Sequence, residues 1–406
     1  MKRSTQFSVG SVIRIVRSVL EDERNPILAT VTLGWFLHLG IRLAFPALVP
    51  YFRAEFGLSL TAAGLLITLL WLTYALGQIP GGLLGDRMGE RNTLTLSTVL
   101  ILLMTVFLAL SVTEWWLFIG IGGLGLTTGL FATTRFTVLT DTYPERSGTV
   151  LGFSSGFGNL GAMVMPVVAV FIADAAGWRL GVGYTVPLFL AVAIGLWVTV
   201  PGRTSASLDS SRGLTTRVRS SLDDLLRPSV LTMVGAMFCM NLVYQSFTGF
   251  FPTYLIAIKG LTEQTASVLY GLFFGCALVV QPLVGAVSDR IGRRVTIIAT
   301  SGLTMIALFA LPFASGLVYL VVLTLFLGVQ TGFWPAAYAT IIEQFSDKNQ
   351  GGTFGIARTV FMVLGSAGPV VTGSVADAGY FDEVFFLLSA VTGVAGLVVA
   401  ATIARG

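Results

Sequence analysis

A decapeptide in the first half of the chain, GLLGDRMGER at residues 82–91, returns in the second half as GAVSDRIGRR at residues 285–294. The two copies lie 203 residues apart in a chain of 406 residues. Further pairs of residues are related by the same offset: Gln78 and Gln281, Gly152 and Gly355, Asp174 and Asp377. The register is kept without a gap between these pairs. The chain is therefore built from two homologous halves.

The composition is that of a membrane protein, because 54% of the residues are hydrophobic and only 11% are charged. A helix needs roughly 20 residues to cross a hydrocarbon core of about 30 Å. Apolar stretches of about that length occur twelve times: residues 27–50, 59–82, 93–112, 115–139, 148–172, 182–200, 229–256, 263–286, 296–314, 317–342, 351–375 and 382–403. We therefore expect an all-α polytopic membrane protein with twelve transmembrane helices, six in each half.

The distribution of basic residues predicts the orientation. If the N-terminus is cytoplasmic, the segments on that side carry 18 of the 24 Lys and Arg residues, and the opposite loops carry only Arg53, Arg179 and Lys259. Because positively charged loops stay inside, both termini are expected to be cytoplasmic, in the cytoplasmic membrane of a prokaryote. The net charge of +4 is then a signal for membrane insertion, and no nucleic-acid partner is expected.

The chain divides into four segments. Residues 1–26 are predicted to form a cytoplasmic amphipathic segment, and residues 201–228 a polar cytoplasmic linker. Between and after them lie the two predicted six-helix bundles, residues 27–200 and 229–406. Every other loop is short, the two cysteines fall in predicted spans, and no cofactor or metal is expected.

The repeated pattern Gly-x-x-x-Asp-Arg-x-Gly-x-Arg, after the second and eighth spans, resembles the signature loop of the major facilitator superfamily. The resemblance covers nearly the whole chain and implies two halves that rock around a site near the membrane midplane. It also implies a conformational switch at these positions: Gly82, Asp86, Arg87, Gly89, Arg91, Gly285, Asp289, Arg290, Gly292 and Arg294. Position 90 is Glu where the family usually has Arg, and simple anchoring by positive charge is the alternative role for Arg91 and Arg293.

Three arginines lie within predicted spans: Arg42, Arg135 and Arg358. A cation at the bilayer centre costs about 2.5–3.5 kcal/mol, so it is expected to face a cavity and meet a partner. Arg42 is the deepest, and His38 precedes it by four residues, which places both on one helical face. No carboxylate lies near the middle of any span, so the interior is electropositive and favours an anionic substrate. A carboxylate fits an arginine fork in a bidentate manner.

Alternatives remain for each of these cations. Arg135 and Arg358 lie within about two turns of the cytoplasmic ends of their spans, where snorkelling or pairing with Asp141 or Glu343 is equally compatible with the sequence. His38 is either a satisfied interior imidazole or a group that couples transport to protons.

By the same resemblance, spans 1, 4, 7 and 10 line the cavity, with spans 2, 5, 8 and 11 beside them. Polar and aromatic residues on these spans complete the predicted substrate site: Arg42, His38, Tyr74, Arg135, Asn241, Gln245, Trp334, Tyr338 and Arg358. The resulting hypothesis is a secondary transporter of a small organic anion, working by alternating access as a monomer and coupled to a proton or a counter-anion. The alternative is a multidrug or metabolite exporter, and no enzymatic activity is expected.

Overall fold

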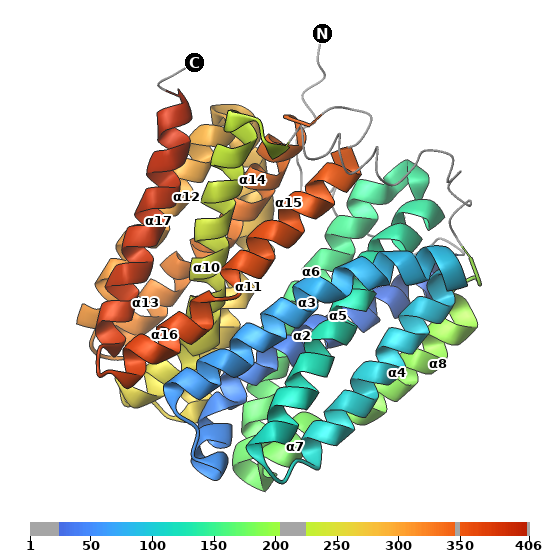
Figure 1. Ribbon diagram of the computed structural model, residues 1–406, viewed down its shortest axis with the longest axis horizontal. Helices are drawn as coiled ribbons and strands as arrows, with labels where there is room; N and C mark the ends of the chain where they lie inside the picture. Colours follow the sequence, from blue (N-terminus) through green and yellow to red (C-terminus); the bar gives the residue numbers. More distant parts are fainter. Residues whose placement is uncertain (1–23, 204–224, 346–349, 404–406) are drawn as a thin grey trace.

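A computed structural model describes residues 24–203, 225–345 and 350–403. In these ranges the chain is helical and contains no strand, and 12 helices are long and apolar enough to cross a membrane (Figure 1). The first half contains α2 (Asn25–Phe56), α3 (Leu60–Met88), α4 (Glu90–Ala109), α5 (Glu114–Thr142), η1 (Pro144–Arg146), α6 (Ser147–Ala176), α7 (Trp178–Gly183) and α8 (Val186–Thr199). The second half contains α10 (Pro228–Ala257), α11 (Glu263–Ile291), α12 (Arg293–Ala310), η2 (Leu311–Phe313), α13 (Leu317–Gly328), η3 (Val329–Gly332), α14 (Phe333–Ile342), α15 (Gln350–Gly365), α16 (Gly368–Asp377) and α17 (Phe381–Ile403).

The twelve predicted spans are confirmed, and the sequence offset of 203 reappears in the helix bounds. α3 begins after Ser59, whose side chain accepts a hydrogen bond from the Ala62 backbone, and α11 begins after Thr262, which caps Thr265 in the same way. Both helices end at a residue with positive φ, a conformation that glycine adopts without steric cost. These glycines are Gly89 (φ 85°) and Gly292 (φ 96°). The repeated loop therefore ends its helix in the same way in both halves.

The tenth and eleventh spans are interrupted, unlike their counterparts in the first half. The tenth runs through α13, η3 and α14, and the eleventh through α15 and α16. Each break lies shortly before a proline, Pro335 or Pro369, which cannot donate a backbone hydrogen bond and disfavours helical geometry in the residue before it. The prolines favour a break at these two places but do not impose one, because Pro166, the counterpart of Pro369, lies within the uninterrupted α6.

The two halves touch mainly on one side of the membrane. α2 begins and α17 ends on the opposite side (Figure 1), which we call the terminal side. Away from that side α3 packs along α16, and α6 packs against α11. There a Cβ added to Gly64 would meet the Pro369 carbonyl oxygen at 2.4 Å, and one added to Gly271 would meet the Met163 carbonyl oxygen at 2.5 Å. The backbones of the two halves are therefore in direct contact on the far side.

On the terminal side, by contrast, there is free space around the corresponding glycines. A Cβ added to any of these glycines would meet no atom within 4 Å: Gly82, Gly152, Gly285 and Gly355. They lie on α3, α6, α11 and α15. The first three of these helices also pair across the halves on the far side, and α15 is continued there by α16. The structure is consequently closed away from the chain ends and open toward them.

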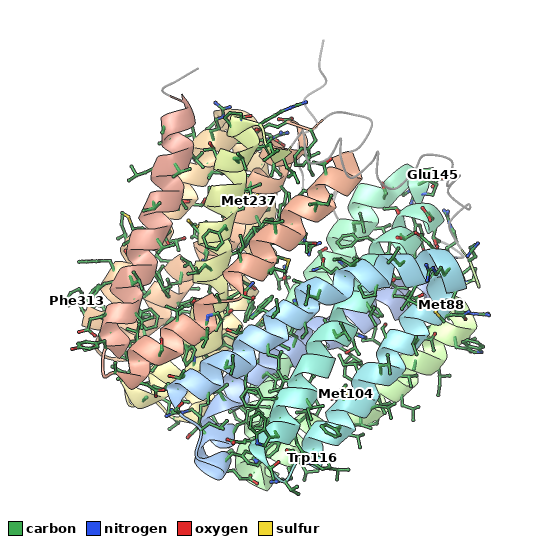
Figure 2. All side chains as sticks on the ribbon, viewed as in Figure 1. Met88, Met104, Trp116, Glu145, Met237 and Phe313 are labelled. Carbon is green, nitrogen blue, oxygen red and sulfur yellow. The ribbon has the colours of Figure 1, made fainter. Side chains whose placement is uncertain are left out.

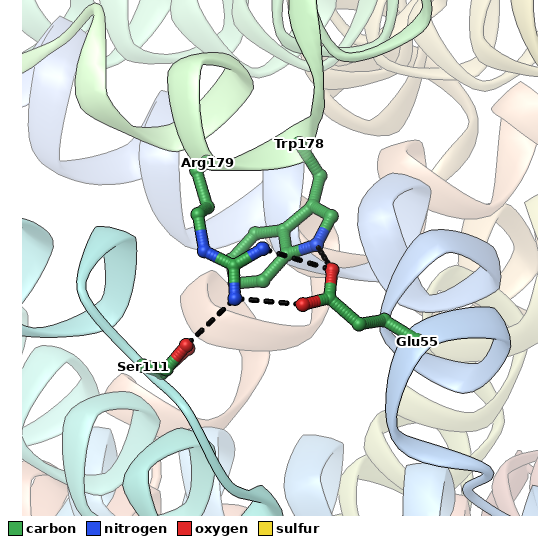
Figure 3. Close-up of polar contacts among 4 residues, drawn as sticks. All are labelled: Glu55, Ser111, Trp178 and Arg179. Atoms are coloured by element: carbon green, nitrogen blue, oxygen red, sulfur yellow. Dashed lines mark hydrogen bonds and ion pairs between the residues drawn. The ribbon is translucent and has the colours of Figure 1, made fainter.

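A polar cluster ties together the far-side ends of three helices in the first half (Figure 3). Glu55 accepts hydrogen bonds from Trp178 Nε1 and from Arg179 Nη1, the latter at 2.9 Å, and pairs with Arg179 Nη2 at 2.7 Å. Arg179 also donates to the Ser111 carbonyl oxygen at 2.8 Å. The cluster joins α2, the segment after α4 and α7.

Large apolar side chains such as Phe313 are exposed on the outside of the described helices (Figure 2), as expected for a surface in contact with lipid. The predicted amphipathic segment 1–26 and linker 201–228 fall mostly outside the described residues. At their edges Arg24 lies over the Tyr143 ring, 4.8 Å from its centroid, and Arg203 donates to the Asp86 carbonyl oxygen at 2.6 Å.

Candidate functional site

A cavity of about 250 Å³ lies between the two halves. Its walls come from α2, α3, α5 and α6 on one side and from α10, α11, α14 and α15 on the other. Seven of the nine residues predicted for the substrate site line it: Arg42, Tyr74, Arg135, Asn241, Trp334, Tyr338 and Arg358. The cavity therefore brings together all three arginines that lie within spans.

Arg42 lies on α2 and is only 4% exposed. Its guanidinium carbon is 3.7 Å from the centroid of the Tyr74 ring and 4.7 Å from that of Trp71. These contacts stabilise the cation through the ring faces. Its Nε and Nη1 atoms have no hydrogen-bond partner within the described chain. Arg42 therefore lines the cavity and carries two buried donor atoms that no described group satisfies.

Arg135 lies on α5 and is 2% exposed. Its Nη1 donates to Ser154 Oγ at 2.9 Å, and its guanidinium carbon lies 4.2 Å from the Trp35 centroid and 4.5 Å from that of Phe136. Neither Asp141 nor any other carboxylate is paired with it in the described structure. Arg135 is held by a hydroxyl and two rings, which leaves its charge uncompensated.

Arg358 lies on α15 and lines both this cavity and a neighbouring space between α3 and α15. Its Nε atom is buried without a hydrogen-bond partner among the described residues. Glu343, a partner considered from the sequence, instead forms an ion pair with Arg293. The Tyr74 side chain lies within electrostatic range of Arg42, Arg135 and Arg358 together. No Asp or Glu is among the described lining residues, so the cavity is electropositive.

Two predicted residues lie outside the cavity. The His38 ring stacks on Phe131 with the centroids 4.1 Å apart, meets Phe189 edge-on, and has its Nδ1 2.8 Å from the Gly34 carbonyl oxygen. It is fully buried inside the first half. The structure differs from the prediction because residues four apart on a helix are rotated by about 40°, and the short imidazole does not reach around as Arg42 does.

Gln245, the repeat counterpart of Arg42, is also fully buried and absent from the lining. Neither its Nε2 nor its Oε1 has a hydrogen-bond partner within the described chain. Sequence spacing placed it near the cavity, but spacing alone does not give the rotation of α10 about its axis.

Several lining residues were not among the predicted site residues. Trp35 and Trp71 provide the ring faces on which Arg135 and Arg42 rest, and Asn159 donates to Gln281 across the halves at 3.3 Å. The signal was present for Trp71, which lies three residues before Tyr74 and hence on the same helical face. Apolar spans are rich in aromatic residues, so a tryptophan alone did not stand out.

The two signature loops lie at the open terminal side. The side chains of Asp86 and Asp289 are exposed, and neither forms a hydrogen bond or ion pair in the described structure. In the first loop Arg91 lies over the Trp197 ring, 4.4 Å from its centroid. In the second, Arg293 pairs with Glu343 and also donates to the Ala339 carbonyl oxygen at 3.2 Å. Arg91 and Arg293 occupy different positions of the repeat, so these contacts do not test the effect expected of the Glu at position 90.

A family profile described as Major Facilitator Superfamily matches residues 30–276 and 255–405. The chain is 24% identical to the hexuronate transporter of Bacillus subtilis, over 94% of this chain and 95% of that protein. It is 26% identical to a probable sulfoacetate transporter of Cupriavidus necator, over 92% of each.

A third relative has a different kind of substrate. The chain is 26% identical to the multidrug resistance protein MdtG of Proteus mirabilis, over 89% of this chain and 92% of that protein. Among solved structures, a bacterial homologue of the human lysosomal transporter Spinster, in an inward-facing and unoccupied conformation, superposes with a TM-score of 0.75 at 16% identity. That similarity covers 94% of this chain and 95% of the other.

Proposed function

This chain belongs to the major facilitator superfamily, and from that premise we propose that it is a secondary transporter of a small organic anion. It is a multi-pass protein of the cytoplasmic membrane, as its twelve apolar helices and bacterial relatives indicate. Two relatives that align with almost the whole chain are named for hexuronate and sulfoacetate, both of which are anions.

The observation that carries the proposal is the state of Arg42. It is nearly buried, lies in a cavity between the halves, and has unpaired Nε and Nη1 atoms. A buried guanidinium without a carboxylate partner is costly. The aromatic faces of Trp71 and Tyr74 cover its plane and leave its edge for a ligand. A carboxylate or sulfonate of the substrate supplies the missing acceptor.

The other arginines extend this site toward the terminal side. Arg135 and Arg358 form a positive vestibule that attracts the anion and holds its second polar group. With the termini cytoplasmic, as the basic loops predict, the open side is the cytoplasm and the structure is inward-facing. Among the described residues, the exposed carboxylates of Asp86 and Asp289 have no hydrogen-bond or ion-pair partner in this open form. This fits a role for their loops in stabilising the outward-facing state, in which the terminal ends of the halves meet.

A second function, export of drugs or metabolites, is favoured by a specific feature of the same cavity. Aromatic residues from both halves line it, including Trp35, Tyr244 and Trp334, and such surfaces bind apolar molecules. The similarity to MdtG points in the same direction. In that case the arginines would be stabilised by the ring faces alone and would take no part in binding.

A thermal-shift screen separates the two functions, because a ligand that binds the folded state raises the melting temperature. Detergent-purified protein is heated with glucuronate, sulfoacetate, inorganic anions, and neutral or cationic drugs. Stabilisation by an anion that disappears in Arg42→Gln supports the anion transporter. The matched control is Arg53→Gln on the same helix, whose Nε donates to the Leu58 carbonyl oxygen far from the cavity. Stabilisation only by drugs, unchanged in Arg42→Gln, would establish the exporter instead.

A further inference from the structure

The cavity contains more positive charge than one anionic group of a substrate neutralises. Three guanidinium groups line it, those of Arg42, Arg135 and Arg358. The remaining ionisable groups among the described lining residues are the phenols of tyrosines. One anionic group needs one arginine fork, so the other cations have a further consequence for the transport cycle.

These cations are already poorly solvated in the open form. Arg42 and Arg135 are 4% and 2% exposed, and each arginine has at least one buried donor atom without a partner in the described structure. The rings of Trp71, Tyr74 and Trp35 lie against the guanidinium planes. Ring faces attract a cation but carry no net charge. Apart from the hydrogen bond of Arg135 to Ser154, further compensation in the open form has to come from solvent that reaches the cavity from the terminal side.

Alternating access requires an intermediate in which the cavity is closed to both sides. Closing the terminal side expels this water and leaves the three positive charges in a medium of low dielectric constant. An uncompensated charge is strongly disfavoured there, whereas a bound anion offsets it. The empty carrier therefore stays in an open state, whereas the loaded carrier can pass through the occluded intermediate.

We propose that this protein is an obligate anion exchanger. The two halves switch between the inward-facing and outward-facing states only with an anion bound, so one anion leaves for each one that enters. This inference rests on the proposed function. It also identifies the coupling partner, since a proton symporter returns empty after a titrating group in the site has lost its proton. The described lining has no carboxylate or imidazole for that role.

The test uses the full-length protein in liposomes. Uptake of radiolabelled glucuronate or sulfoacetate, chosen by the thermal-shift screen, is compared between vesicles loaded with the same unlabelled anion and vesicles that contain only a non-binding buffer. We expect uptake into loaded vesicles to be faster by about tenfold or more, given the cost of burying an arginine. A pH gradient imposed across empty vesicles should not restore it.

Equal uptake into loaded and empty vesicles, or uptake driven by the pH gradient, would overturn the exchange proposal while leaving the anion transporter intact. Anion binding without any uptake in loaded vesicles would also overturn it. If no anion stabilises the protein, the proposed function itself fails, which is a separate result.

A variant tests the electrostatic cause. Arg358→Gln removes one cavity charge and keeps Arg42. Because Arg358 is also proposed to hold the second polar group of the anion, uptake is compared as the ratio of empty to loaded vesicles at an anion concentration that saturates uptake into loaded vesicles. We expect uptake into empty vesicles to approach that into loaded vesicles, because the empty carrier now buries less charge on closing. Arg53→Gln, outside the cavity, should keep the wild-type ratio. If the ratio of uptake into empty and loaded vesicles is unchanged in Arg358→Gln, the excess charge does not impose exchange. Whether the wild-type protein is an exchanger is decided by the wild-type comparison, without either variant.

Discussion

The carboxylate of Asp377, at the end of α16, caps the first turn of α3 through Thr61. Oδ2 accepts hydrogen bonds from the Thr61 backbone nitrogen at 2.7 Å and from its hydroxyl at 2.5 Å, and Oδ1 accepts one from the Leu60 nitrogen at 2.8 Å. A carboxylate at a helix N-terminus satisfies free N–H groups and interacts favourably with the helix dipole. This contact joins the two halves on the closed side.

Removal of this cap should weaken closure of the far side. Asp377→Asn keeps the size of the side chain but loses its charge, at a cost of about 0.5–1 kcal/mol for an exposed site. The population of the state that is open on the terminal side should then fall by about two- to fivefold relative to the state that is closed there. Spin labels at Met88 and Ile291, exposed at the terminal ends of α3 and α11, would report this as a larger share of short distances. The two native cysteines must first be replaced.

The repeat supplies the control for this measurement. Asp174 is the counterpart of Asp377 and is likewise exposed, but it caps no helix in the described structure. Asp174→Asn should therefore leave the distance distribution unchanged. Equal shifts in the two variants would mean that the Asp377 contact does not bias the conformation.

The open glycines predict a second effect. Gly152 on α6 faces space in which an added Cβ meets nothing within 4 Å, yet the terminal ends of the halves must meet there when that side closes. A leucine at this position should be tolerated in the open form and obstruct the closed one. We expect Gly152→Leu to reduce transport at least about tenfold while anion binding in the thermal-shift assay persists.

Gly302 on α12 provides the matched substitution. It too has no atom within 4 Å of an added Cβ, but α12 packs on α17 and α14 and not on the other half. Gly302→Leu should transport normally. Full transport by Gly152→Leu would show that the space around Gly152 stays open throughout the cycle.

Much of this fold follows from the sequence because membrane helices have strong and simple signals. The length of the apolar stretches gave the number of spans, and the offset of 203 related the bounds of α3 to those of α11. Ser59 and Thr262 cap these helices, and Gly89 and Gly292 end them, so each boundary has a local chemical cause. These features involve only a few neighbouring residues and can therefore be predicted from the sequence.

The site was harder to predict because it depends on the rotation of each helix about its axis and on the conformational state of the transporter. Arg42 lines the cavity, as expected of a buried cation, whereas His38 lies inside the first half against Phe131, which is one of the two positions that the sequence left open. Gln245 occupies the repeat position of Arg42 and is buried elsewhere. Whether the far or the terminal side is closed is a property of inter-half contacts such as Asp377 with Thr61, which no periodicity reveals.

The contact between Arg42 and the Tyr74 ring predicts a loss of stability when the ring face is removed. Tyr74→Leu removes a face that lies 3.7 Å from the guanidinium carbon, and we expect a loss of about 1–2 kcal/mol because this site is desolvated. Tyr74→Phe keeps the ring and should retain most of the stability. Thermal unfolding of the two variants without ligand measures the difference. Equal melting temperatures would mean that the ring does not stabilise Arg42.

The Glu55 cluster predicts a local effect that should leave the site untouched (Figure 3). Glu55→Gln loses the ion pair with Arg179 while the amide can still accept from Trp178. Both charged side chains are partly exposed, 37% for Glu55 and 42% for Arg179, so the loss should be about 1 kcal/mol or less. Because α7 is only six residues long, its amide hydrogens should exchange faster in this variant, with no change in anion binding. Glu114→Gln, at the start of α5 on the same side, is the control. Faster exchange spread over the second half would contradict the local role.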